Sequence, residues 1–332
     1  MNDPGSTVPA ATRRLDPDAA GLAEASARLR AGDLVAFPTE TVYGLGADAT
    51  DPAAVARIFA AKERPRFNPL ISHLPDLAAA LTEGDFDAQA RRLAEAFWPG
   101  PLTLVVPAHG GSRVSDLARA GLPSVALRVP AHPLARTLLS AVGRPVAAPS
   151  ANRSGRVSPT RAAHVLDDLA GRIAAVLDGG DTPVGVESTV VACLGGPPRL
   201  LRPGGITRAA LRAVLGHDPA TSEAADADRP AGPGMLASHY APRARVRLDA
   251  TRIEPGEAVL LFGAARPEGH AQACAALNLS PAGNAEEAAA RLFGALRDLD
   301  ASGAATIAVV PIPDEGLGEA IRDRLARAAA PR

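Results

Sequence analysis

The segment of residues 37–47 has the sequence FPTETVYGLGA and separates an apolar run from the start of a helix. Hydroxyl-bearing residues occupy alternate positions in it. An extended backbone would place them along one side, where they would line a small polar pocket: Thr39, Thr41 and Tyr43. Gly44 and Gly46 predict a tight loop with positive φ angles. They also resemble part of a dinucleotide-binding fingerprint, but that motif opens its helix directly after a strand, and here a polar Thr-Glu-Thr turn intervenes.

Short apolar strands and amphipathic helices surround this segment and predict an α/β domain over residues 17–215, after a disordered N-terminus of residues 1–16. The strands are too irregularly spaced for a simple βαβ series. Strands are expected at 33–38, 68–73, 102–107, 125–129, 146–148, 173–177, 189–194 and 199–202, and helices at 19–30, 51–63, 87–98, 132–142, 161–169 and 208–215.

Residues 216–243 are rich in proline, glycine and small polar residues and predict a linker. Beyond it, residues 244–332 predict a second, smaller α/β domain. Its strands at 257–262, 275–279 and 306–310 alternate with helices at 285–299 and 318–328, which favours a small parallel sheet with flanking helices.

Composition excludes several classes of protein. The 332 residues carry a net charge of −1, which does not indicate a general polyanion binder. Two cysteines are too few for a disulfide framework and lack metal-ligand spacing, and the sequence shows neither a membrane-spanning apolar run nor a signal peptide. We therefore expect a cytoplasmic protein.

Lys62 is the only lysine among 35 basic residues. Where arginine replaces lysine elsewhere, the one lysine indicates a position that needs a compact ammonium. It ends a helix, and a proline-stiffened loop with further donors follows: Arg64, Arg66 and Asn68. Such donors match a triphosphate. No glycine-rich Walker loop precedes Lys62, so side chains would have to hold the nucleotide.

Polar residues gather where other predicted strands end. Arg128 lies on the polar side of an alternating strand and would face either solvent or a cleft. The loop of residues 149–155 and the segments 187–190 and 201–204 carry small hydroxyl and amide residues and an arginine. Strand ends of this kind form ligand crevices in open α/β sheets. Ser188 lacks the Gly-x-Ser-x-Gly setting of a hydrolase nucleophile, and the seven histidines show no metal-ligand spacing.

These segments together, in this order, resemble the YrdC-like family, and within it the long two-domain threonylcarbamoyl-AMP synthases. The matching segments are 37–47, 62–73, 98–103, 125–130, 148–155, 187–190, 201–205 and 238–242. The resemblance implies a twisted open sheet with flanking helices and a concave cleft, followed by a small Rossmann-like C-terminal α/β domain.

The resemblance also implies a nucleotidyltransferase. Its substrates would be L-threonine, bicarbonate or CO2, and ATP; its products would be L-threonylcarbamoyl-AMP and pyrophosphate. Mg²⁺ would arrive with ATP. Other proteins would then transfer the product to tRNA to give threonylcarbamoyl-adenosine, and this chain would contact tRNA at most weakly. A threonine carbamate is already an anionic nucleophile, which agrees with the lack of a catalytic triad in the sequence.

The family's site residues carry over motif by motif. Threonine would contact Thr41, His73, Arg128, Ala148 and Ser188, with Arg128 on its carboxylate. ATP would be surrounded by Lys62, Arg64, Asn68, Ser124, Ser150, Asn152, Ser158, Arg202 and Tyr240. Lys62 and Arg64 would be catalytic, and no metal-ligating residue is expected. Tyr240, in the linker, would close over the nucleotide.

Two alternatives remain from the sequence. The first is an RNA-binding module that uses a positive concave face without catalysis. The net charge of +3 over residues 21–210 gives it little support. The second is the carbamoyl-transfer role that this domain has inside hydrogenase-maturation proteins, but this chain lacks their zinc-finger cysteine pairs.

Overall fold

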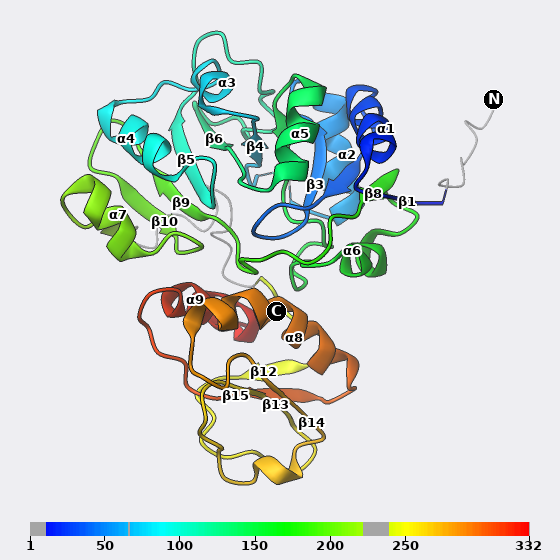
Figure 1. The fold of residues 1–332 in the computed structure, drawn as a ribbon, viewed down its shortest axis with the longest axis vertical. Helices are drawn as coiled ribbons and strands as arrows, with labels where there is room; N and C mark the ends of the chain where they lie inside the picture. The colour runs from blue at the N-terminus through cyan, green and yellow to red at the C-terminus, as the bar shows by residue number, and fades with distance from the viewer. Residues whose placement is uncertain (1–10, 66, 222–238, 332) are drawn as a thin grey trace.

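The computed structural model describes residues 11–65, 67–221 and 239–331. Its described part contains two sheets (Figure 1): an eleven-stranded mixed sheet and a four-stranded sheet that is parallel throughout. The expected fold class is therefore confirmed. No helix among the described residues is both long and apolar enough to cross a membrane.

The large sheet has the strand order β1-β8-β2-β3-β7-β4-β6-β5-β9-β10-β11. Its strands are β1 (Arg13–Leu15), β2 (Val35–Phe37), β3 (Gly44–Asp48), β4 (Ile71–His73), β5 (Leu102–Pro107), β6 (Ser124–Arg128), β7 (Val146–Ala147), β8 (Ala175–Leu177), β9 (Thr189–Ala192), β10 (Arg199–Arg202) and β11 (Ala220–Thr221).

Seven helices accompany this sheet in the described residues: α1 (Ala19–Arg30), α2 (Pro52–Lys62), α3 (Leu77–Leu81), α4 (Ala88–Phe97), α5 (Pro133–Val142), α6 (Ala162–Leu169) and α7 (Arg208–Leu215). Their starts follow local chemistry. Asp18, Asp51 and Asp87 each accept a hydrogen bond from a backbone N–H of the first turn. Pro52 then occupies the first helical position of α2.

The central glycines correct one expectation. Gly44 and Gly46 lie within β3 and have no positive φ angle, so they do not form a tight loop. A Cβ atom on Gly46 would lie 2.8 Å from a ring carbon of Phe37 and 3.0 Å from the carbonyl oxygen of Val35. Close packing of β3 against β2, and not a turn, requires glycine there.

The N-terminus corrects another. Arg13–Leu15 pairs in parallel with β8, so this part of the segment expected to be disordered is an edge strand. Residues 1–10 lie outside the described residues. Sequence reasoning also did not predict α3, β11 or β12 (Arg245–Arg247), because each is short and has weak periodicity.

The second sheet has the order β12-β15-β13-β14, with β13 (Ala258–Leu261), β14 (Ala275–Asn278) and β15 (Thr306–Val309). A short 3₁₀ helix, η1 (His270–Gln272), precedes β14. Figure 1 shows α8 (Ala285–Ala301) and α9 (Gly318–Ala329) between this sheet and the large domain. The predicted linker of residues 216–243 lies partly outside the described residues, so its bounds and its path stay a prediction.

One apolar cluster joins the two parts of the chain. Val42, Val157 and Val186 of the large domain belong to the same buried cluster as Phe293 of α8. At Gly185, where φ is +74°, a Cβ atom would lie 2.3 Å from the carbonyl oxygen of Ala289. The loop before β9 therefore packs directly on α8, and this close packing holds the second domain beside the strand ends of the first.

Candidate functional site

A cavity with about 570 Å³ of empty space, counting its open mouth, lies at the ends of several strands of the large sheet. Segments far apart in sequence meet there. Nine of the fourteen predicted site residues line it: Arg64, Asn68, His73, Arg128, Ala148, Ser150, Ser188, Arg202 and Tyr240.

Strand register brings His73 and Arg128 together. β4 and β6 run parallel with His73 opposite Arg128, so both side chains belong to neighbouring strand ends. Arg128 faces the cavity and not solvent; it is 4% exposed. Its NH2 group donates to Glu40 Oε1 at 2.7 Å, while its Nε has no partner among the described residues. The guanidinium is therefore oriented and keeps donor capacity for a ligand.

His73 is neutral at physiological pH. Burial, aided by the charge of Arg128, lowers its pKa to about 3. Its ring packs edge-on against Phe37, with centroids 6.3 Å apart. His73 therefore supplies a neutral ring to the cavity wall, and the positive charge at this end comes from Arg128.

Ser188 is held from two sides. Arg202 donates from Nε and NH2 to the carbonyl oxygen of Ser188, at 3.2 and 2.8 Å, and from NH2 to its hydroxyl at 3.2 Å. The hydroxyls of Ser188 and Thr103 are 2.7 Å apart. Arg202 thus lines the cavity as a cation and also fixes the position of Ser188.

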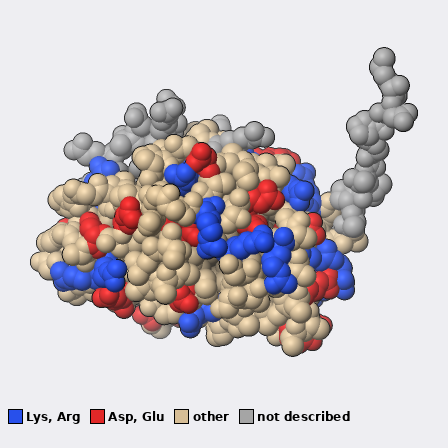
Figure 2. All heavy atoms as spheres, turned by 90° about the horizontal axis from the view of Figure 1, so that it is seen from above, with Lys and Arg blue, Asp and Glu red and all other residues tan. Residues whose placement is uncertain are grey.

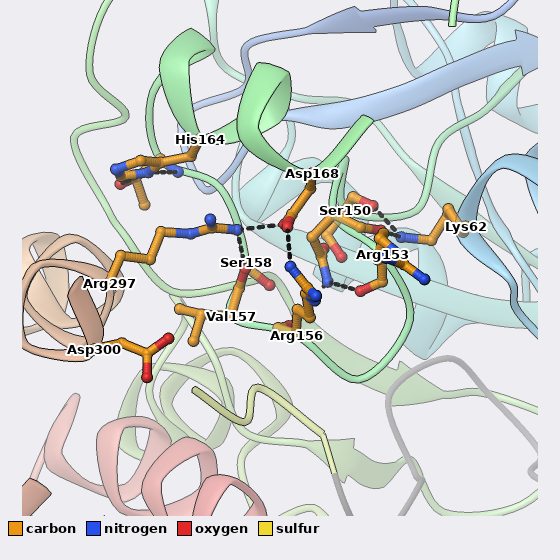
Figure 3. A network of polar contacts seen from close by, with 12 residues as sticks. Lys62, Ser150, Arg153, Arg156, Val157, Ser158, His164, Asp168, Arg297 and Asp300 are labelled. Atoms are coloured by element: carbon orange, nitrogen blue, oxygen red, sulfur yellow. Dashed lines mark hydrogen bonds and ion pairs between the residues drawn. The ribbon is translucent and has the colours of Figure 1, made fainter. Parts of the chain in front are cut away.

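Lys62 is 1% exposed, and its side chain points at the loop that carries Ser150 (Figure 3). Its ammonium donates to the carbonyl oxygen of Ser150 at 2.5 Å and to that of Asn152. An ammonium has three hydrogens, so one donor remains. Burial lowers the pKa of Lys62, and the charge of Arg64 lowers it further. An anion in the cavity would offset both effects.

Arg64 and Asn68 also present unused polar atoms. Arg64 Nε and Asn68 Oδ1 are buried without a partner among the described residues. Burial, together with repulsion from Arg202, lowers the pKa of Arg64 to about 10, so it stays charged at neutral pH. The unpaired donor of Arg64, beside further cations, is typical of a site for an anionic ligand, whereas Asn68 Oδ1 is an unpaired acceptor. Arg66 lies outside the described residues.

Five predicted site residues are buried but do not line the cavity: Thr41, Lys62, Ser124, Asn152 and Ser158. The Thr41 hydroxyl is 2.8 Å from that of Thr39, so two of the expected row of hydroxyls stay together. Tyr43, the third, instead donates to the carbonyl oxygen of Gly180 at 2.8 Å. It does not belong to the cavity.

Tyr240 lines the cavity from the linker and is 1% exposed. Its φ of 63° is unusual for a tyrosine and marks a strained backbone. Its ring stacks on Phe293 of α8, with centroids 5.5 Å apart, and packs beside His239 at 4.1 Å. Residues 222–238 lie outside the described residues, so closure of the linker over a nucleotide stays a prediction.

Sequence reasoning missed several lining residues, among them Val42, Glu187 and His239. Each adjoins a residue that was predicted. Glu187 lies in the motif of Ser188, and His239 precedes Tyr240, yet neither has a pattern of its own. Their neighbours in the chain were the only available signal.

The comparisons with known proteins agree with this geometry. Residues 27–204 match the family model described as "Telomere recombination" (Sua5_yciO_yrdC), and residues 206–330 match "Threonylcarbamoyl-AMP synthase, C-terminal domain". The chain is 43% identical over 325 residues to a Bacillus subtilis protein named threonylcarbamoyl-AMP synthase; the match covers 94% of this chain and 93% of that protein.

The chain belongs to the threonylcarbamoyl-AMP synthase family. A Pyrococcus abyssi member is 41% identical, with 92% of each chain covered. The crystal structure of P. abyssi Sua5 complexed with L-threonine superposes with a TM-score of 0.86 at 38% identity, covering 96% of this chain and 97% of that one. The family expected from the motifs is confirmed, and with it the conclusion that the chain is an enzyme.

Buried histidines predict how stability depends on pH. Burial lowers the pKa of His73 to about 3 and holds that of His239 well below its usual value. The unfolded chain binds protons at these histidines below about pH 6.5, and the folded chain does not. The free energy of unfolding should therefore decrease as the pH is lowered from 7.5 to 5.5. Below the unfolded pKa of about 6.5, each histidine should contribute up to about 1.4 kcal/mol per pH unit to this decrease.

Urea unfolding at several pH values measures this slope. His73→Gln should reduce it, and His217→Gln, at an exposed position, should not. If His73→Gln leaves the slope unchanged, the low pKa of His73 in the folded protein is contradicted.

Lys62→Arg should be far from conservative. A guanidinium is larger than the space between the two carbonyls that the ammonium bridges, so it would displace the loop at Ser150. Displacements near 1 Å at a reacting centre can cost ~10²-fold in rate. We expect a loss of kcat/KM of that order in a folded protein. Arg57→Lys, the reverse exchange on an exposed part of α2, is the control and should keep full activity.

Proposed function

We propose that this chain catalyses the ATP-dependent formation of L-threonylcarbamoyl-AMP from L-threonine and bicarbonate or CO2, with release of pyrophosphate. As a nucleotidyltransferase, it would supply the carbamoyl donor for threonylcarbamoyl-adenosine in tRNA. The family membership and the relative solved with L-threonine support the substrate class.

One observation carries the proposal: three arginines converge on one cavity, and two of them, Arg64 and Arg128, have an unused Nε donor. Arg64, Arg128 and Arg202 all line it, and Glu187 is the only acidic residue lining it in the described part of the chain. The transferred group moves between two anions, a carbamate and pyrophosphate. A site that positions and neutralises them needs cations and small polar groups more than a proton-transfer triad.

The residues divide by position. Arg128 and neutral His73 sit at one strand-end pair and suit the carboxylate and hydroxyl of threonine, with Ala148 and Ser188 adjoining. Arg64, Asn68, Ser150 and Arg202 suit the phosphates. A carbamate oxygen would attack the α-phosphorus, the bond to the β-phosphate oxygen would break, and both electrons would leave with pyrophosphate. Lys62 and Arg64 would offset the charge that develops on the leaving group.

Mg²⁺ is proposed as the companion of ATP. In the described residues no three His, Cys, Asp or Glu side chains gather as a protein cage for a metal would require. Phosphate oxygens and water would therefore supply its ligands, as is common for Mg²⁺ with nucleotides. Transfer of the product to tRNA by other proteins, and a cytoplasmic location, stay predictions from the sequence.

The RNA-binding alternative would need a basic surface. On the face in Figure 2, basic side chains adjoin one another near the centre, with acidic side chains beside them. Nucleic-acid binding without catalysis would require the unused cavity arginines to have another purpose.

Pyrophosphate release tests the function directly. The full-length protein should release pyrophosphate from ATP and Mg²⁺ only when L-threonine and bicarbonate are both present, with one product formed per pyrophosphate. Omitting each component in turn is the control. Release that does not depend on threonine, or salt-sensitive tRNA binding without turnover, would contradict the proposal.

Arg128→Ala should mainly weaken threonine binding. A buried charge pair that loses one partner costs roughly 2–5 kcal/mol. We expect a large rise in the KM for threonine, with the KM for ATP little changed. Because Glu40 also loses its partner, the melting temperature is measured alongside. Arg136→Ala, at an exposed position on α5, serves as the control. A rise in the KM for ATP alone would assign Arg128 to the phosphates.

A further inference from the structure

One buried side chain reaches the cavity wall from the second domain. Arg324 lies on α9 and has 0% exposed surface, which makes it the largest fully buried side chain of the described residues. Its Nε donates to Glu187 Oε2 at 2.7 Å, across 137 positions of sequence. Glu187 itself lines the cavity, next to Ser188.

Arg324 makes further contacts that fix its position. It pairs with Asp323 at 2.5 Å, and its guanidinium lies over the ring of Tyr240, 5.3 Å from the ring centroid. One guanidinium nitrogen, NH2, remains without a partner among the described residues. Two carboxylates and an aromatic face are contacts that the planar fork of arginine suits and a lysine ammonium does not.

The far side of the Glu187 carboxylate is also engaged. Ser158, one of the residues expected near ATP, donates from its hydroxyl to Glu187 Oε1 at 2.5 Å. Two series of contacts therefore start at Arg324 of α9: one passes through Glu187 to Ser158, and the other joins the guanidinium face to the ring of Tyr240. Ser158 and Tyr240 both belong to the predicted nucleotide site.

Glu187 needs a cation. Burial would favour its neutral form, but the charges of Arg324 and Arg202 outweigh burial and hold the pKa of the carboxyl below its usual value. Glu187 is therefore an anion in the wall of a cavity that we assign to anions. Without Arg324, the carboxylate would repel phosphate and compete with it for Arg202.

We propose that Arg324 is a positioning residue, supplied to the catalytic cavity by the C-terminal domain, which neutralises Glu187 and fixes Ser158 and Tyr240 for nucleotide binding. The inference rests on the proposed function, because it concerns the ATP side of that site. It gives the second domain a chemical role: the cavity is electrostatically complete only when α9 is docked.

Other contacts across the same boundary lie farther from the cavity. Arg297 of α8 donates to Asp168 of α6 at 2.7 Å and to the carbonyl oxygen of Val157 (Figure 3), and Arg208 of α7 donates to Glu319 of α9 at 2.7 Å. None of these five residues lines the cavity. They hold the domains together, so loss of one would test docking without altering the charge of Glu187.

The experiment compares Arg324→Met, Arg324→Lys and the double variant Arg324→Met/Glu187→Gln in the full-length protein. Arg322→Met is the control, because Arg322 lies on the same helix and contacts no residue that lines the cavity. Its exposed side chain donates to the carbonyl oxygen of Ile312 at 3.0 Å and approaches the exposed Asp314 at 3.8 Å. Pyrophosphate release gives kcat and the KM values for ATP and threonine, and thermal unfolding reports stability.

We expect Arg324→Met to raise the KM for ATP about tenfold, which corresponds to about 1.4 kcal/mol, with a smaller change in the KM for threonine. Adding Glu187→Gln should recover most of that loss, because it removes the unpaired charge. Arg324→Lys should lie between Arg324→Met and the wild type. Arg208→Met should lower stability without this selective rise.

Two results would overturn the inference: unchanged KM for ATP in Arg324→Met, or a double variant as impaired as the single one. If Arg324→Met unfolds too readily to assay, Arg324→Lys decides, since a selective rise in the KM for ATP at retained stability supports the inference and wild-type kinetics overturn it. Wild-type protein without threonine-dependent release would refute the proposed function instead, and that result is read before any variant is compared.

Discussion

The site depends on keeping several positive charges buried around one cavity. Arg64, Arg128 and Arg202 all line it, and burial lowers the pKa of Arg64 and of Arg202. Repulsion among them opposes folding, so each is placed where carbonyl oxygens, a carboxylate or a future ligand offsets its charge. Much of the surrounding architecture serves this requirement. Glu40 orients Arg128, and the carbonyl oxygen of Ser188 holds Arg202. The positive charge that these contacts leave uncompensated attracts an anion.

The same constraint explains how the domains meet. A carboxylate in the cavity wall is tolerable only with a cation behind it, and that cation comes from α9. The apolar cluster that Val42 and Val186 share with α8 supplies the close contact between the domains, and the Glu187–Arg324 ion pair fixes the position of α9 against the large domain. Docking energy and site chemistry are therefore coupled, because one buried ion pair contributes to both. Neutral His73 and strained Tyr240 complete a site that is organised before any ligand enters.

Chemistry at this site needs no proton-transfer machinery among the described residues. The nucleophile that we propose is already an anion, and the leaving group is an anion as well. What limits such a reaction is bringing two negative groups together and holding them in line. A compact ammonium at Lys62, bonded to the carbonyl oxygens of Ser150 and Asn152, fixes the loop that borders the cavity, and in the reaction that we propose its third hydrogen would serve the ligand. This double use explains why lysine persists in a chain that is otherwise rich in arginine.

Local patterns in the sequence were sufficient for much of this protein. Helical periodicity predicted α1 and α7 at the observed bounds, and the ordered motifs predicted the family. Such signals act over a few residues, so sequence alone determines them. Gly44 and Gly46 were misjudged because they lie in a strand and not in a turn, and the need for glycine at Gly46 comes from Phe37 and Val35 on the neighbouring strand. The link from Arg324 to Glu187 spans 137 positions, and no periodicity or motif indicates it. Only the tertiary structure decided it, because an ion pair between distant segments is set by which buried charges packing brings together.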